Sequence, residues 1–223
     1  MAHASADLSR LHVIVPVRAL EGGKARLGAA LDAEEREELI VGMLRRLLRE
    51  VGAWGRASSV AVVSPDPAVL ALAAHEGARP IEQPSEGLNE GIRVAREVVT
   101  AAGATAVLVL PADLPLVTAS ALRRLDDAAD AALAAGAGTP LVVVVAADAR
   151  SGTNALLLAP PNVIEPAFEE ASCAAHLRAA ERAGASVQLV TDPVLGFDLD
   201  TPEDVERLGP VLVAELQALG AGR

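Results

Sequence analysis

The chain has 223 residues, which is enough for one sizeable hydrophobic core and short for two independent domains. Its formal net charge of −11 argues against a general nucleic-acid-binding protein, because such proteins neutralise phosphates with clustered Lys and Arg. Only two Phe, one Trp and no Tyr are present, so base stacking on aromatic rings is nearly excluded. A single cysteine excludes an intramolecular disulfide and a cysteine-based zinc site.

No membrane-spanning segment is predicted. The first ten residues are polar and Ala-rich, and no apolar run approaches the ~18 residues needed to cross a bilayer. We therefore expect residues 1–10 to form a disordered tail on a soluble, cytoplasmic protein with neither membrane nor nucleic-acid partners. A surface rich in Ala and Leu would be compatible with a homodimer.

The first half of the chain alternates short apolar runs with amphipathic segments. Residues 11–17 form a β-branched apolar run, which predicts a buried strand followed by a glycine-bearing loop. From 33 to about 52, apolar residues recur at spacings of three and four, which predicts an amphipathic helix. Further along, we expect a strand at 59–64, a helix at 68–75, a strand at 79–81, a helix at 89–101 and a strand at 106–110.

The second half is less regular. We expect a helix at 119–135, strands at 141–146 and 155–158, a helix at 171–183, a strand at 187–190 and a terminal helix at 202–219. The segment between 146 and 155 is too short for a crossover helix, so these two strands should be antiparallel neighbours. Elsewhere the alternation predicts a parallel sheet covered on both faces. The fold class is thus α/β, with three layers around a mixed, mostly parallel sheet.

Two aspartates lie two residues apart in the segment FDLDTPED at 197–204. In an extended chain, Asp198 and Asp200 project to one side, while the apolar residues beside them turn to the other. The TPED half predicts a helix N-cap, a first-turn proline and a third-position acid that reaches back to the cap. Taken alone, the pair is explained equally well as an acidic turn.

A third aspartate follows a buried strand. The strand at 106–110 runs into PADLP, which places Asp113 at its carboxyl end, where open α/β sheets bind ligands. A proline-bounded turn is the structural alternative. Together with Asp198 and Asp200, however, Asp113 offers the hard oxygen ligands that Mg²⁺ prefers when phosphates complete its coordination. The three acids therefore predict a magnesium site.

The loop after the first strand combines glycines with basic residues. Backbone N–H groups exposed at Gly22 and Gly23, together with Arg18, Lys24 and Arg26, could cradle a triphosphate. The spacing is neither that of a Walker A loop nor GxGxxG. A flexible loop with solvated charges is the alternative.

Six segments, in this order, resemble one family. The sequence is similar to the 2-phospho-L-lactate guanylyltransferases of coenzyme F-420 biosynthesis, which are related to the guanylyltransferase of molybdenum-cofactor synthesis. The resemblance implies the nucleotide-diphospho-sugar transferase type of Rossmann-like fold and a single nucleotidyltransferase domain over 1–223. The segments are VIVPVRALEGGKARL at 13–27, VVSPD at 62–66, EGLNEGI at 86–92, VLVLPADLP at 107–115, SGTNALLL at 151–158 and FDLDTPEDV at 197–205.

The resemblance also implies roles for individual residues. The metal ligands would be Asp113, Asp198 and Asp200, which would hold two Mg²⁺ ions. The same aspartate at 113 would act in catalysis with Lys24 and Arg26. Nucleotide contacts would come from Arg18, Lys24, Arg26, Ser64, Gly87 and Asn89, although Gly87 and Asn89 are also explained by a helix start that Asn89 caps.

The phosphorylated acid would bind to Thr153, Asn154, Glu169 and Ser172. The family has FGxGS in the segment where this chain has FEEAS, at 168–172, so both glycines are replaced and Glu169 and Glu170 add negative charge. His176, four residues after Ser172, is interpreted as a helix-face or substrate-side histidine. Nothing marks the orienting acid or the oxyanion site that a Ser-His hydrolase would need.

The reaction implied is attack by the phosphate of a small phosphorylated carboxylic acid on the α-phosphorus of GTP, with release of pyrophosphate. Phosphoenolpyruvate and 2-phospho-L-lactate are the expected acceptors. The replaced glycines leave 3-phosphoglycerate, molybdopterin and a sugar phosphate open as other acceptors. A nucleotide-binding module without catalytic turnover is the alternative of a different class.

Overall fold

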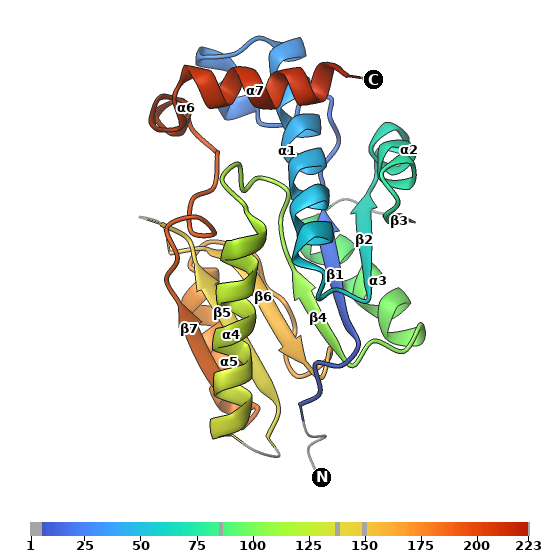
Figure 1. Ribbon diagram of the computed structural model, residues 1–223, viewed down its shortest axis with the longest axis vertical. Helices are drawn as coiled ribbons and strands as arrows, with labels where there is room; N and C mark the ends of the chain where they lie inside the picture. The colour runs from blue at the N-terminus through green and yellow to red at the C-terminus, as the bar shows by residue number, and fades with distance from the viewer. Residues whose placement is uncertain (1–5, 85–86, 137–138, 149–150, 223) are drawn as a thin grey trace.

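A central sheet organises the molecule in the computed structural model, which describes residues 6–84, 87–136, 139–148 and 151–222 (Figure 1). Its seven strands have the order β3-β2-β1-β4-β6-β5-β7. β6 is antiparallel to both of its neighbours, and the other pairs are parallel. The sequence predicts a mixed, mostly parallel sheet and the antiparallel pair of β5 and β6, but not the antiparallel pair of β4 and β6. The strands are β1 Leu11–Pro16, β2 Ser59–Ser64, β3 Arg79–Glu82, β4 Ala106–Val109, β5 Leu141–Ala146, β6 Thr153–Ala159 and β7 Ser186–Val190.

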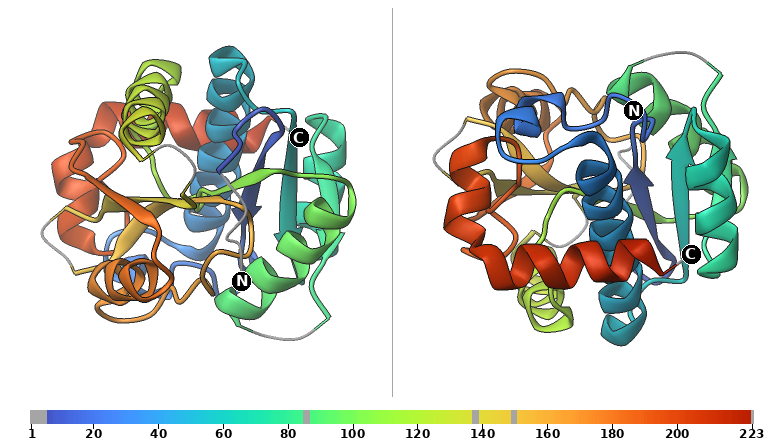
Figure 2. Two further views of the ribbon diagram at one scale, coloured as in Figure 1. Left: turned by 90° about the horizontal axis from the view of Figure 1, so that it is seen from below. Right: turned by 90° about the horizontal axis from the view of Figure 1, so that it is seen from above.

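Helices cover both faces of this sheet, which gives the predicted three layers. Figure 2 (left) shows α1 and α4 on one side of the strands and α3 and α5 on the other. No helix in the described part of the chain is long and apolar enough to cross a membrane. The helices are α1 Ala33–Trp54, α2 Pro67–His75, α3 Leu88–Ala101, α4 Ala119–Ala135, α5 Ser172–Arg182, α6 Pro202–Leu208 and α7 Pro210–Ala221, with a short 3-10 helix, η1, at Ala25–Ala29.

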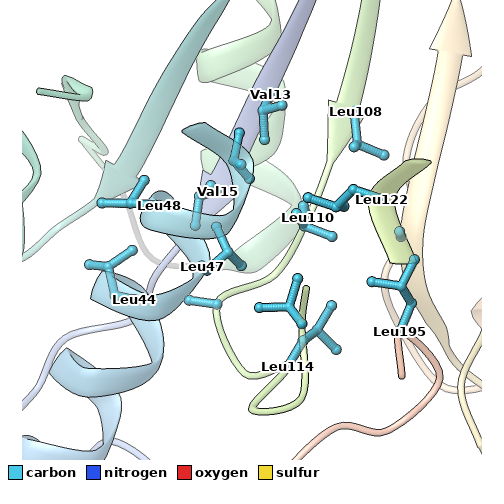
Figure 3. Packing of buried hydrophobic residues seen from close by; sticks show 14 of the residues in the cluster. Val13, Val15, Leu44, Leu47, Leu48, Leu108, Leu110, Leu114, Leu122 and Leu195 are labelled. Carbon is cyan, nitrogen blue, oxygen red and sulfur yellow. The ribbon is translucent and has the colours of Figure 1, made fainter. Parts of the chain in front are cut away.

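Strand alternation divides the core into two apolar clusters. Val13 and Val15 of β1 point into the cluster beneath α1 and α4, whereas Ile14 points into the cluster beneath α3 and α5. Leu47 of α1 and Leu110 after β4 belong to the first cluster, where Figure 3 shows them close to Val15. The polypeptide leaving β4 is thus held by the same core as α1.

The C-terminal region differs from the single predicted helix at 202–219. Gly209 has φ 83, a left-handed conformation that ends α6, and Pro210 begins α7. α7 then crosses α1 (Figure 2, right). A Cβ on Gly42 of α1 would collide with the backbone carbonyl of Leu216 in α7, so the two helices touch backbone to backbone.

The predicted tail over residues 1–10 is wrong for its second half. Leu8 is 3% exposed and belongs to the core, and the Ala6 N–H donates to the carbonyl of Thr139 at 3.2 Å. Burying this leucine removes apolar surface from water and, together with the hydrogen bond of Ala6, favours an ordered segment. Residues 1–5 lie outside the described residues.

Candidate active site

A cavity of about 560 Å³ opens where the chain leaves β1 and β4. It brings together the glycine loop, the turn after β4 and a residue from the acidic segment near 200, which are far apart in sequence. Five of the predicted site residues line it. The lining consists of Pro16, Val17, Arg18, Ala19, Glu21, Gly22, Gly23, Lys24, Ala25, Arg26, Ile40, Met43, Leu88, Pro111, Ala112, Asp113 and Asp200.

Lys24 bridges two carboxylates inside this cavity. Its Nζ donates to Asp113 Oδ2 at 2.8 Å and to Asp200 Oδ1 at 2.6 Å. Burial by itself would lower the pKa of Lys24, but the two carboxylates outweigh it and raise the pKa above its ordinary value. The ammonium therefore stays charged, and the two aspartates predicted to act together do converge on one point.

Backbone hydrogen bonds fix the two aspartates relative to each other. The Leu199 N–H donates to the carbonyl oxygen of Asp113 at 3.0 Å, which joins the two acidic segments directly. Asp204 Oδ2 accepts from the backbone N–H of Asp200 at 3.0 Å and of Thr201 at 2.8 Å. The predicted capping box at the start of α6 is thus confirmed, and it holds Asp200 in place.

The glycine loop makes contacts that its sequence pattern does not predict. Lys24 adopts a left-handed conformation, φ 50, at the start of η1, which turns its side chain toward the aspartates. A Cβ on Gly23 would lie 2.9 Å from the backbone carbonyl oxygen of Ala19, so the tight turn of the loop favours glycine here. The Leu20 N–H donates to Asp66 Oδ2 at 2.9 Å, which ties the loop to the start of α2.

Ser64 and Asp66 serve the scaffold in this structure. Ser64 is fully buried, and its hydroxyl accepts from the Asp66 N–H at 3.1 Å. Asp66 also caps α2 by accepting from the Ala68 N–H at 2.8 Å. Ser64 is absent from the cavity lining, so its predicted nucleotide contact stays a prediction. Asp66 as the anchor of the glycine loop was missed, although an aspartate directly before Pro67 is a sequence signal for a helix cap.

Asp198 does not line the cavity that contains the other two predicted metal ligands. Phe197 and Leu199 are buried and Asp198 and Asp200 partly exposed, as the alternation predicts. Yet Asp198 Oδ1 accepts from Asn154 Nδ2 at 3.3 Å and does not line the cavity. Within residues 6–84, 87–136, 139–148 and 151–222, no three His, Cys, Asp or Glu side chains are grouped to hold a metal ion.

The remaining pair nevertheless suits magnesium. Asp113 and Asp200 each place a carboxylate oxygen within 2.8 Å of Lys24 Nζ, so the two carboxylates are close enough to share one cationic group. Mg²⁺ is usually held by one or two protein carboxylates, with substrate phosphates and water completing the shell. The donor chemistry of this pair therefore fits the ion.

Three of the four predicted acceptor residues, Thr153, Asn154 and Ser172, are buried, whereas Glu169 is exposed. Thr153 and Asn154 begin β6, each 6% exposed, and Ser172 begins α5, 3% exposed. Asn154 Nδ2 donates to the carbonyl of Gly196 at 2.8 Å. Thr153 Oγ1 lies 3.0 Å from Nδ1 of the buried His176. None of these side chains lines the cavity.

The FEEAS segment contains one residue in a left-handed conformation. Ala171, which stands where the family has its second glycine, has φ 59, a left-handed conformation that glycine adopts without strain. Glu169 and Glu170 are exposed. The two added charges therefore stand at the surface of the segment while its backbone keeps a left-handed turn.

Asn89 connects α3 to this segment. Its Oδ1 accepts from the Phe168 N–H at 2.7 Å, and its Nδ2 donates to Glu169 Oε1 at 3.3 Å. α3 begins directly after Gly87, φ 112, so Gly87 and not Asn89 occupies the cap position. Leu88 between them lines the cavity. The predicted nucleotide contacts of Gly87 and Asn89 stay predictions, and Glu86 of the same motif lies outside the described residues.

Comparison with known proteins identifies a family for this chain. The family described as guanylyl transferase CofC like matches residues 11–212. The phosphoenolpyruvate guanylyltransferase of Rubrobacter xylanophilus is 45% identical over 195 residues, which cover 87% of this chain and 91% of the relative. The 2-phospho-L-lactate guanylyltransferase of Methanocaldococcus infernus is 28% identical over 195 residues, which cover 87% and 82%.

A solved structure supports the fold independently. The crystal structure of a protein described as a nucleotide-diphospho-sugar transferase, from Desulfovibrio desulfuricans G20, matches with a TM-score of 0.70 over 96% of this chain and 97% of that one. Its sequence identity is 16%, so the likeness concerns the fold alone. Since the family match spans nearly the whole chain, the protein belongs to the CofC-like guanylyl transferase family.

Proposed function

We propose that this protein transfers GMP from GTP to phosphoenolpyruvate and releases pyrophosphate, as a step of coenzyme F-420 biosynthesis. The observation that carries the proposal is the bridge from Lys24 to Asp113 and Asp200 in the strand-end cavity. The choice of phosphoenolpyruvate rests on the relative that is 45% identical and bears that name. 2-Phospho-L-lactate is the alternative acceptor, after the relative at 28% identity.

The cavity offers positive charge for a triphosphate. Arg18, Lys24 and Arg26 all line it, and the loop that carries them includes the glycines at 22 and 23. Fixed cations at a phosphate stabilise the negative charge that develops as the bond to the leaving group breaks. The lining also holds Glu21, Asp113 and Asp200, and Lys24 is paired with the two aspartates, so Arg18 and Arg26 are the cations that would attract the nucleotide.

The reaction is an in-line displacement at phosphorus. A phosphate oxygen of the acceptor forms a bond to the α-phosphorus, and the bond from that phosphorus to the β-bridging oxygen breaks, so that pyrophosphate leaves with the electron pair. The acceptor phosphate is already anionic near neutral pH, so no strong general base is required. Catalysis comes from positioning and charge neutralisation, with no covalent enzyme intermediate.

Magnesium would be held by Asp113 and Asp200, and it would supply neutralisation of phosphate charge when bound. The part of Asp198 in metal binding, and a second ion, stay predictions. Lys24 contributes a charge whose position is set by the loop and by the two carboxylates. Asp204 and the carbonyl of Asp113 keep the acidic segments in that arrangement.

A substrate panel tests the proposal. The purified protein is incubated with Mg²⁺, each nucleoside triphosphate and, in turn, phosphoenolpyruvate, 2-phospho-L-lactate and 3-phosphoglycerate, and pyrophosphate and product mass are measured. We expect pyrophosphate and a GMP adduct only with GTP, and most rapidly with phosphoenolpyruvate. A protein that binds GTP but releases no pyrophosphate with any acceptor would be a nucleotide-binding module, and the proposal would be wrong.

Transfer to a different phosphorylated acceptor is the second candidate. Glu169 and Glu170, exposed in the segment that would face the acidic acceptor, favour it, because they add two negative charges beside an anion. A sugar phosphate and molybdopterin are therefore included in the panel. Activity with one of these and none with the carboxylic acids would select this candidate.

A further inference from the structure

His176 is a buried titratable residue that the proposed transfer does not use. It is 0% exposed on α5, and its ring packs edge-on against Phe168 with 5.2 Å between ring centroids. Both ring nitrogens have partners. Nδ1 lies 3.0 Å from Thr153 Oγ1, and Nε2 lies 2.9 Å from the backbone nitrogen of Ala167.

These partners determine where the ring proton is. A backbone N–H only donates, so Nε2 must accept from Ala167 and cannot carry a proton. Burial lowers the pKa of His176 to about 4, which keeps the ring neutral near pH 7. A neutral imidazole has one N–H, and it is therefore on Nδ1. Nδ1 donates, and Thr153 Oγ1 accepts.

The direction of that hydrogen bond fixes the role of the Thr153 hydroxyl. A hydroxyl that accepts from histidine keeps its own proton for another acceptor. Among the residues that the structure describes, the Thr153 hydroxyl has no hydrogen-bond partner other than His176. Thr153 stands at the start of β6, which pairs antiparallel with β4, so it lies at the sheet edge where β4 leads into Asp113.

The same histidine also contacts the backbone at residues 167–172, called here the acceptor segment. Its bond to Ala167 lies directly before Phe168, whose backbone is bound by Asn89 beside the cavity. The segment is therefore attached on one side to β6 and α5 through His176, and on the other to α3 through Asn89.

We infer that His176 is a positioning residue that presents the Thr153 hydroxyl as a hydrogen-bond donor to an anionic group of the acceptor, and that keeps the segment at Ala167 against β6. The inference rests on the proposed function, since it assigns the acceptor rather than the nucleotide to Thr153. It adds a residue that touches no substrate and acts only through its neighbours.

A double-mutant cycle on KM tests the inference. Thr153→Val removes the hydroxyl at nearly constant shape, and His176→Leu removes both ring hydrogen bonds. We expect His176→Leu to raise KM for phosphoenolpyruvate by about tenfold, the size of effect expected for a hydrogen bond to a charged group, and to change KM for GTP by less than about twofold. In the Thr153→Val background the rise caused by His176→Leu should be several-fold smaller, and what is left reports the contact with Ala167, which Thr153→Val does not remove.

Multiplicative effects in the cycle, or equal rises in both KM values, would overturn the inference. His75→Gln, which changes a histidine whose side chain is 80% exposed, is the matched control and should leave both KM values unchanged. Partial recovery in His176→Asn, which can restore a donor near the Nδ1 position, would support the inference, and no recovery relative to His176→Leu would contradict it.

Nitrogen NMR of the histidine rings in the wild-type protein keeps the inference testable if His176→Leu does not fold. The expected signal for His176 is a neutral ring with the proton on Nδ1, and a proton on Nε2 would overturn it. This measurement needs no turnover. Failure of phosphoenolpyruvate as an acceptor would therefore refute the proposed function, while the tautomer separately decides the contact between His176 and Thr153.

Discussion

The parts of the site that we propose to bind the nucleotide and the acceptor, called here the nucleotide side and the acceptor side, are held together by different forces. At the strand-end cavity, the key contacts join charges, with the Lys24 ammonium 2.8 Å and 2.6 Å from two carboxylates. On the acceptor side, the contacts at Thr153 and His176 join neutral groups and are buried. The first arrangement neutralises charge, while the second fixes the directions of donors and acceptors.

The two kinds of contact differ in how easily they can be exchanged for contacts with a ligand. Charged partners in a partly open cavity can exchange for phosphates or a cation without leaving a buried group unpaired. A buried neutral hydrogen bond has no such freedom, because breaking it costs the desolvation of both groups. We therefore expect the cavity residues to govern turnover and the acceptor-side residues to govern stability and acceptor affinity.

The largest expected effect is on turnover in the cavity. Asp113→Asn should lower the rate of pyrophosphate release by about 10³-fold, since it removes a carboxylate that neutralises Lys24 and would hold magnesium. The free energy of unfolding should change little, because the side chain is 31% exposed. Asp130→Asn, which changes an exposed aspartate on α4, is the matched control. Near-normal turnover in Asp113→Asn would contradict the metal assignment.

Acid should weaken the acceptor side first. The pKa of His176 is lowered from 6.5 to about 4 by burial, so the folded protein binds fewer protons there than the unfolded chain does. The stability that this residue contributes is complete above about pH 6.5 and is lost as pH falls toward 4, by at most about 3 kcal/mol.

Urea unfolding of the wild type and of His176→Leu, compared between pH 7 and 4, measures this contribution. The wild type should lose more stability over that range than the variant. Parallel pH profiles for the two proteins would mean that His176 is protonated as readily in the folded state as in the unfolded state.

A smaller effect is expected where the two sides meet. Asn89→Ala removes both hydrogen bonds from α3 to the acceptor segment, so KM for the acceptor should rise by about tenfold and more than KM for GTP. Asn162→Ala, at an exposed asparagine, should change neither value. A larger rise in KM for GTP would instead place Asn89 on the nucleotide, as the sequence resemblance implies.

The smallest effect concerns backbone strain in the FEEAS segment. Ala171→Gly should raise the free energy of unfolding by about 1 kcal/mol, because the left-handed conformation at φ 59 strains alanine and not glycine. Ala174→Gly within α5 should lower it by about 0.5–1 kcal/mol, since glycine is unfavourable in a helix. Chemical unfolding of both variants measures whether the free energy of unfolding rises or falls in each. Destabilisation by Ala171→Gly would show that this position is not strained.

Local patterns predicted much of this molecule because they depend on neighbouring residues. Alternating apolar runs identified the strands, and the antiparallel pairing of β5 and β6 followed from a connection too short for a helix. The cap at 201–204 was readable for the same reason. The break at Gly209 was missed, although the Gly-Pro dipeptide at 209–210 is a sequence signal for the end of a helix.

The candidate site was predicted in part. Asp113, Asp200 and Lys24 were identified from their positions after strands and in the glycine loop, and the structure brings them together. The sequence could not separate Asp198 from Asp200, because two-residue spacing gives both the same direction. Only the arrangement of β6 beside the acidic segment brings Asn154 to Asp198.

The sequence by itself determined the α/β class, the family and the identity of the charged residues, because these depend on composition, periodicity and motif order. The tertiary structure alone decided which of those residues meet. It placed one ammonium between two aspartates that are 87 residues apart in sequence, and a histidine against a threonine from another element. Such contacts depend on how the strands are ordered in the sheet, which no local pattern of residues encodes.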